Sequence, residues 1–130
     1  MRIDHVSLYV KNLEKAKAFF IKYFHATSNE KYKNPITKLE TYFLTFDHHT
    51  RLEIMSKPNL SSVNRKEPYE GYHHIAFKLA SKTELESLTR NLENDGYDIV
   101  NGPRITGDGY LETLFYYEKH LIELTYYDHL

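Results

Sequence analysis

Two short segments of the chain repeat one pattern, and this repeat constrains the fold more than any other feature. Residues 3–10 read Ile-Asp-His-Val-Ser-Leu-Tyr-Val, and residues 72–79 read Tyr-His-His-Ile-Ala-Phe-Lys-Leu. Aligned, the segments place His5 on His74 and put three apolar residues of each at matching alternate positions. Because alternate residues of a strand share a face, both segments are predicted strands with apolar side chains on one face and the histidine on the other.

Each half of the chain also ends in a strand pattern that carries one glutamate between apolar residues. Leu52-Glu53-Ile54 closes the first half and Ile122-Glu123-Leu124 closes the second. Glu53 follows His5 by 48 residues (53 minus 5), and Glu123 follows His74 by 49 (123 minus 74). The chain therefore reads as one structural unit used twice.

The segments between these landmarks predict a strand, a helix and three strands in each half. Apolar residues at three- and four-residue steps predict a helix over 13–24, with Asn12 as its N-cap. A capping box at Ser81 and a glycine at Gly96 bound the second helix. The remaining strands are predicted at 26–34, 39–46, 51–55, 97–100, 111–117 and 121–127, and a glycine-rich loop is predicted at 101–109. The predicted organisation is a first module at 1–57, a linker at 58–71 and a second module at 72–130.

Composition excludes several classes of partner. The chain has 17 Lys and Arg against 18 Asp and Glu, a balance that argues against nucleic acid as a partner. No apolar run approaches the ~20 residues of a membrane-spanning helix, and no signal-peptide layout is evident. Without cysteine there is no disulfide scaffold and no thiolate ligand. We expect a soluble cytoplasmic protein whose 12 Tyr and 7 Phe cover sheet faces or line a pocket for a small molecule.

The repeated histidine and glutamate form the candidate functional site. A single glutamate on a strand is usually a solvated residue, and a single histidine is usually a packing or surface residue. The coincidence of both at nearly equal spacing in two similar halves favours a shared role. His5, Glu53, His74 and Glu123 are therefore the predicted ligands of a divalent cation such as zinc, nickel, cobalt or manganese.

These segments together resemble the glyoxalase / bleomycin-resistance / extradiol-dioxygenase (vicinal oxygen chelate) superfamily over nearly the whole chain. The resemblance implies an α+β fold in which two βαβββ modules form one glyoxalase-like domain whose curved sheets enclose a cavity. It also implies metal ligands on the first and last strand of each module, and a homodimer in which modules of different chains can complete each site. Two histidines and two glutamates are most similar to the ligand set of glyoxalase I (lactoylglutathione lyase).

The resemblance implies a mechanism and three alternative functions. As a glyoxalase-type lyase or isomerase, the protein would use Glu123 as the base that moves a proton between adjacent carbons of an enediolate, with Glu53 as its partner. Alternatively, it would sequester a drug or metabolite without chemistry, as bleomycin-resistance proteins do. An iron-dependent extradiol dioxygenase fits least well, because this chain has an extra carboxylate ligand and no clear second catalytic histidine. Both extradiol dioxygenases and the fosfomycin-resistance enzymes of this superfamily use two histidines and one glutamate.

Three departures from the glyoxalase I pattern concern its thiol substrate. Tyr9 stands where that enzyme usually has a glutathione-binding arginine, and Lys57 stands where it has an asparagine. The turn before the last strand reads Tyr-Glu-Lys-His at 117–120 instead of Asp-Pro-Glu-Gly. Arg51, Lys57 and Arg104 are the alternative candidates for holding an anionic substrate.

Overall fold

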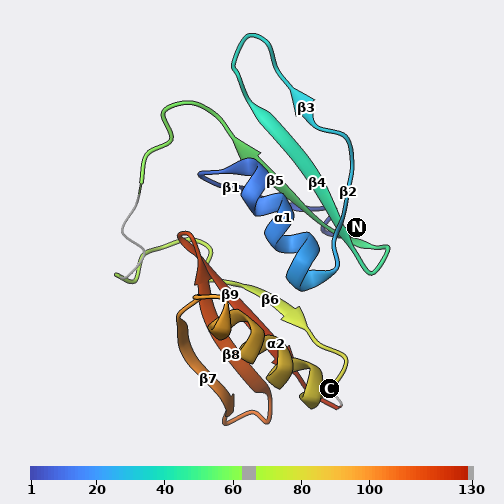
Figure 1. Ribbon diagram of the computed structural model, residues 1–130, viewed down its shortest axis with the longest axis vertical. Helices are drawn as coiled ribbons and strands as arrows, with labels where there is room; N and C mark the ends of the chain where they lie inside the picture. Colours follow the sequence, from blue (N-terminus) through green and yellow to red (C-terminus); the bar gives the residue numbers. More distant parts are fainter. Residues whose placement is uncertain (63–66, 129–130) are drawn as a thin grey trace. The chain divides into compact units, whose positions relative to one another are not determined.

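The computed structural model describes residues 1–62 and 67–128 (Figure 1). The chain divides into two compact units, Met1–Ser62 and Val63–Leu130. Over the described residues, each unit consists of one sheet and one helix. Among the described residues, no helix combines the length and the apolar character needed to cross a membrane.

The first unit contains one mixed sheet with a helix on one face. Its elements are β1 (Val6–Tyr9), α1 (Leu13–Phe24), β2 (Thr27–Ser28), β3 (Tyr32–Lys33), β4 (Glu40–Phe46) and β5 (Thr50–Ser56). The strand order is β1-β5-β4-β2, with β3 also on β4. The first and last strands, β1 and β5, are parallel neighbours, whereas β4 and β5 form an antiparallel hairpin.

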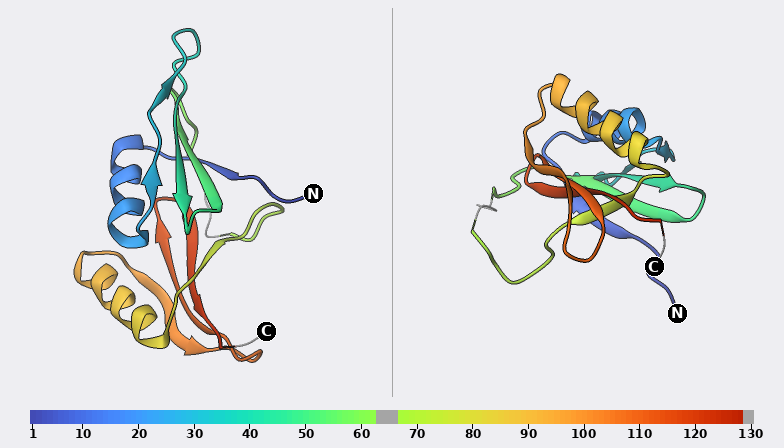
Figure 2. Two further views of the ribbon diagram at one scale, coloured as in Figure 1. Left: turned by 90° about the vertical axis from the view of Figure 1, so that its right-hand side faces the viewer. Right: turned by 90° about the horizontal axis from the view of Figure 1, so that it is seen from below.

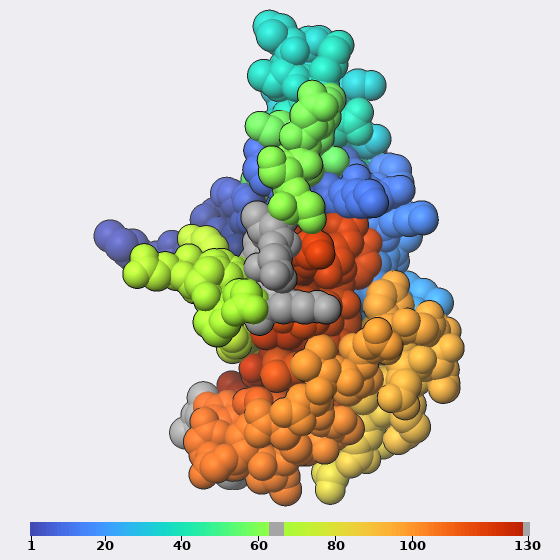
Figure 3. Space-filling model, turned by 90° about the vertical axis from the view of Figure 1, so that its left-hand side faces the viewer, coloured from blue at the N-terminus to red at the C-terminus, as the bar shows by residue number. Residues whose placement is uncertain are grey.

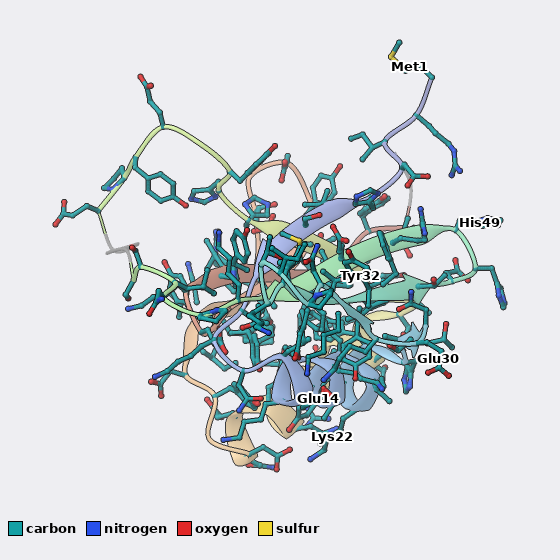
Figure 4. The ribbon with its side chains drawn as sticks, turned by 90° about the horizontal axis from the view of Figure 1, so that it is seen from above. Met1, Glu14, Lys22, Glu30, Tyr32 and His49 are labelled. Carbon is teal, nitrogen blue, oxygen red and sulfur yellow. The ribbon has the colours of Figure 1, made fainter. Side chains whose placement is uncertain are left out.

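Helix α1 begins and ends where its capping residues place it. The Asn12 side chain accepts a hydrogen bond from the Lys15 amide at 3.0 Å, and His25 ends the helix in the left-handed conformation with φ 55°. Figure 2 shows α1 lying along one side of the sheet, and Figure 4 shows Glu14 and Lys22 on this side. The core between helix and sheet contains Ala16, Phe19, Phe20, Tyr42, Leu44, Leu52 and Ile54.

The second unit repeats this plan. Its elements are β6 (Ile75–Lys78), α2 (Lys82–Asn94), β7 (Ile99–Ile105), β8 (Leu111–Tyr117) and β9 (His120–Tyr126), and the strand order is β6-β9-β8-β7. Again the first and last strands, β6 and β9, are parallel neighbours. In the capping box of α2, Ser81 accepts from the Glu84 amide and Glu84 accepts from the Ala80 amide. The core contains Leu85, Leu88, Leu92, Phe115, Ile122 and Leu124.

The predicted α+β class with paired βαβββ modules is confirmed, and two elements differ from their predicted bounds. The predicted strand at 26–34 is two short strands, β2 and β3, both paired with β4. Their turn into β4 forms one end of the first unit (Figure 3, cyan). Residues 101–105, predicted as loop, belong to strand β7, because β7 tolerates Gly102 and Pro103 at irregularities in its pairing with β8.

Each sheet therefore has two different faces. The helix face carries the apolar residues of the alternating strand patterns. We call the opposite side the open face, and it carries Glu53 in the first unit and Glu123 in the second, because both glutamates lie between buried residues of the helix face. In Figure 4 the N-terminal segment that ends at Met1 extends away from the sheet on the side opposite α1.

Candidate metal centre

The first unit brings His5 and Glu53 together on its open face. The parallel pairing of β1 and β5 sets Ser7 beside Glu53 in register. As a result the His5 Nε2 atom lies 3.8 Å from the Glu53 carboxylate, and the Ser7 hydroxyl donates a hydrogen bond of 2.6 Å to the same oxygen, Oε1. The Glu53 side chain is 18% exposed and that of His5 is 35% exposed. Solvent therefore reaches both side chains of the pair, and the Ser7 hydroxyl holds the Glu53 carboxylate in place.

The second unit brings His74 and Glu123 together in the same way. The parallel pairing of β6 and β9 sets Ala76 beside Glu123, and the His74 Nε2 atom lies 3.0 Å from Glu123 Oε2. The Glu123 side chain is only 12% exposed. The repeated sequence pattern thus produces a repeated contact between imidazole Nε2 and carboxylate.

The surroundings of Glu123 disfavour its charge. Burial raises the pKa of Glu123, and the nearby Glu112 carboxylate raises it further, whereas His74 and Arg104 act in the opposite direction. Glu112 lies on the same open face, where Arg104 Nη2 approaches its carboxylate to 3.7 Å. A cation beside Glu123 would compensate for the lost hydration of this carboxylate.

Neither unit alone gathers a complete ligand set. Over the described residues, no group of three or more His, Asp or Glu side chains is arranged to hold a metal ion. Each unit instead contributes one histidine and one glutamate. The four predicted ligands thus occupy equivalent positions in two equivalent sheets, as two pairs.

Both histidines present Nε2 to the glutamate because their Nδ1 atoms are engaged elsewhere. The Nδ1 atom of His5 lies 2.8 Å from the Asp4 carboxylate, and Arg51 donates to the same carboxylate. These hydrogen bonds, that of His5 first, hold the pKa of Asp4 below its usual value. In the second unit the Nδ1 atom of His74 lies 2.8 Å from Nδ1 of His73.

These partners were absent from the sequence-based site. Asp4 and His73 occupy matching positions immediately before the two candidate ligands, which is the one signal that could have identified them. Among the candidates for holding an anion, Arg51 and Arg104 are both engaged with carboxylates. Lys57 lies over the Tyr9 ring, with Nζ 5.5 Å from the ring centre.

A small cavity of about 190 Å³ lies in the second unit beside His73. Its lining includes Tyr116 and Leu121, which are paired in register on β8 and β9. Leu121 precedes Glu123 by two residues, so the two side chains share the open face. The other lining residues are Glu67, Pro68, Tyr69, Tyr72 and Lys119.

Two βαβββ units, each with a His–Glu pair between its parallel first and last strands, define a class of proteins built by internal duplication. A family model places the chain in that class: residues 2–124 match the Glyoxalase/Bleomycin resistance protein/Dioxygenase superfamily, and the chain belongs to this superfamily. No curated protein sequence matches the chain.

Several solved structures share the fold of this chain at low sequence identity. The fosfomycin resistance protein FosX from Listeria monocytogenes, crystallised with Mn(II) and sulfate, is 22% identical with a TM-score of 0.73, over 98% of this chain and 93% of that chain. The protein SMU.1112c is 18% identical with a TM-score of 0.77, over 96% of this chain and 98% of that one. An integron cassette protein from V. cholerae is 19% identical with a TM-score of 0.67, over 98% and 96%.

Proposed function

We propose that the protein is a metal-dependent lyase or isomerase of the glyoxalase type. His5, Glu53, His74 and Glu123 would hold one divalent cation, nickel, zinc, cobalt or manganese. The observation that carries this proposal is the duplicated contact: in both units an imidazole Nε2 faces a glutamate carboxylate from the neighbouring parallel strand. The fold neighbour FosX was crystallised with Mn(II), which supports a divalent metal on this scaffold.

The residues present fit a divalent cation. Two carboxylates supply two negative charges, and two imidazoles supply neutral nitrogen donors, so the set balances a 2+ ion. Both histidines turn Nδ1 toward a neighbouring side chain, Asp4 for His5 and His73 for His74, and turn Nε2 toward the glutamate. Both carboxylates are largely buried, and such groups need a compensating charge.

The chemistry divides among these residues. A bound divalent cation would supply Lewis-acid polarisation of two adjacent substrate oxygens. Glu123 is the proposed base: displaced from the cation, its carboxylate would take the proton from carbon in a buried setting that, in the metal-free chain, raises its pKa. Glu53 is its proposed partner, oriented by the Ser7 hydroxyl, and the two histidines act as ligands only.

The first experiment tests metal binding and then the substrate. The purified protein is stripped, reloaded with each of the four metals, and analysed for bound metal; wild type should retain stoichiometric metal, and His74→Ala should lose it. The reloaded protein is then assayed with methylglyoxal plus glutathione, and separately with fosfomycin. Stoichiometric metal in the His74→Ala variant would refute the ligand assignment, whereas metal-loaded protein without turnover of methylglyoxal and glutathione would refute that substrate.

The cavity beside His73 favours a second candidate function, sequestration of a small molecule without chemistry. Its volume of about 190 Å³ suits a single ring, since an apolar cavity of about 150 Å³ is known to hold benzene. Tyr69, Tyr72 and Tyr116 supply aromatic walls, and Lys119 supplies a cation. A planar ring fits these walls, and an anionic substituent on it would pair with Lys119 and be repelled by Glu67, which also lines the cavity.

Benzoate binding, measured by NMR titration, separates the two candidates. A sequestering protein should bind benzoate equally with and without chelator, and equally in Glu123→Gln. Tyr72→Ala should weaken that binding several-fold, and the matched control Tyr32→Ala, an exposed tyrosine of the first unit, should not. Binding that requires the metal would instead assign the cavity to the enzyme's substrate.

A further inference from the structure

We propose that Asp4 is a positioning residue that fixes neutral His5 as the tautomer with hydrogen on Nδ1. The His5 Nδ1 atom lies 2.8 Å from Asp4 Oδ2, and a carboxylate can only accept, so Nδ1 donates. The remaining nitrogen, Nε2, then carries the lone pair and lies 3.8 Å from the Glu53 carboxylate. The consequence for metal binding rests on the function proposed above; the tautomer itself does not.

Arg51 holds Asp4 in place. Its Nη2 atom donates to Oδ2 of Asp4, the same oxygen that accepts from His5. Arg51 precedes Glu53 by two residues on β5, so both project from the open face. The Asp4 carboxylate thus bridges a rigid strand residue and the imidazole, although Asp4 itself precedes β1 and is half exposed.

The Phe43 ring supports the other side of this arrangement. The Arg51 guanidinium carbon lies 4.6 Å from the centre of the Phe43 ring, and the His5 ring meets the same ring edge-on at 5.0 Å. Phe43 is paired in register with Glu53. Asp4 and Phe43, each in contact with Arg51, therefore fix the rotation of the His5 ring, which a side chain at the end of an edge strand would not achieve alone.

A carboxylate behind a metal-binding imidazole has a known physical effect. It selects the tautomer, orients the ring and increases the basicity of the nitrogen that faces the metal, and its removal typically costs 10–100-fold in metal affinity. In the described part of the second unit, His73 stands where Asp4 stands in the first and contacts Nδ1 of His74 at 2.8 Å, so an imidazole takes the place of the carboxylate. We therefore assign the carboxylate-assisted ligand to the first unit.

The test reads the tautomer directly in metal-free protein. Nitrogen NMR spectra are recorded on protein with ¹⁵N-labelled histidine at about pH 9, where ordinary imidazoles are neutral. The signals of His5 are identified as those missing from the His5→Ala spectrum. Wild type should show hydrogen on Nδ1 of His5. Asp4→Asn keeps an acceptor oxygen and should retain this tautomer, whereas Asp4→Ala should lose it. The control Asp98→Ala changes an exposed aspartate of the second unit and should leave His5 unchanged.

Zinc titration of the same proteins supplies the second measurement. Asp4→Ala should bind zinc 10–100-fold more weakly than wild type, with Asp4→Asn between the two and Asp98→Ala equal to wild type. Hydrogen on Nε2 of His5 in wild type would overturn the proposal, as would unchanged zinc affinity in Asp4→Ala. If wild type binds no zinc, the metal function proposed above fails, and the tautomer spectrum alone then decides the role of Asp4.

Discussion

The position of Glu123 favours the neutral form of its carboxyl group. Its pKa is raised by burial and by Glu112, so the folded protein binds the proton more tightly than the unfolded chain does. Stability contributed by that proton is present below the unfolded pKa and is lost as the pH rises through the folded pKa. In metal-free protein we expect Glu123→Gln to raise the free energy of unfolding by ~1 kcal/mol at pH 7.5, because it removes a carboxylate whose burial is not fully compensated.

Thermal unfolding at two pH values checks this prediction. The difference in Tm between Glu123→Gln and wild type should be largest at pH 7.5 and should vanish near pH 4, where both side chains are neutral. Glu93→Gln, at an exposed position of α2, is the matched control and should change Tm little at either pH. A Glu123→Gln protein less stable than wild type at pH 7.5 would contradict this account of burial.

The two His–Glu contacts follow from information that the sequence contains, and their partners do not. Equal spacing and alternation place His5 and Glu53 on one face of neighbouring strands, because the first and last strands of each unit are parallel. The contacts of Asp4 depend on where Arg51 projects across that pairing. Strand register and side-chain rotamer decide such contacts, and neither could be read from this one sequence.

At the scale of elements, local signals explain which predictions agree with the structure. Both helices begin at their predicted caps, Asn12 and Ser81, because capping is a local interaction of a side chain with the first turn. Strand β7 was predicted too short, since glycine and proline usually indicate a loop. Its extension to Ile105 depends on pairing with β8, which is a contact between distant residues.

Gly102 makes this pairing testable. A Cβ atom at Gly102, where φ is 101°, would overlap the backbone oxygen of Glu112 and lie 2.9 Å from the Thr113 Cα atom. We expect Gly102→Ala to destabilise the protein by ~3 kcal/mol, the sum of backbone strain and overpacking. The measurement is chemical denaturation.

Gly109 provides the control for Gly102. It has a similar φ of 90°, but a Cβ atom there meets nothing within 4 Å. Gly109→Ala should therefore show the strain alone, ~1 kcal/mol. Equal losses in the two variants would show that β7 does not approach β8 as closely as the structure has it. Because Arg104 and Glu112 lie on these two strands, the Gly102→Ala variant should also disturb their ion pair.

At the scale of the whole molecule, duplication explains why the candidate ligands come in pairs. Each unit is a complete sheet and helix with its own core, yet supplies only half of the proposed ligand set. Such half-sites can be joined within one chain or between two chains of a symmetric dimer. The two arrangements place the same residues around the metal and differ only in which chain supplies them.

Mixing two inactive variants distinguishes these arrangements. His5→Ala damages only the first unit and His74→Ala only the second. In a dimer whose sites combine the first unit of one chain with the second unit of the other, each heterodimer contains one site with both defects and one intact site. Random exchange of equal amounts makes half of the dimers mixed, so about a quarter of the wild-type metal content and activity should return. Sites formed within single chains would return none, because every chain then carries one damaged half-site.

Co-expression of the two variants with different tags, followed by metal analysis of the doubly tagged dimer, gives the sharper form of the measurement. Shared sites should give one metal per dimer, and sites within a chain should give none.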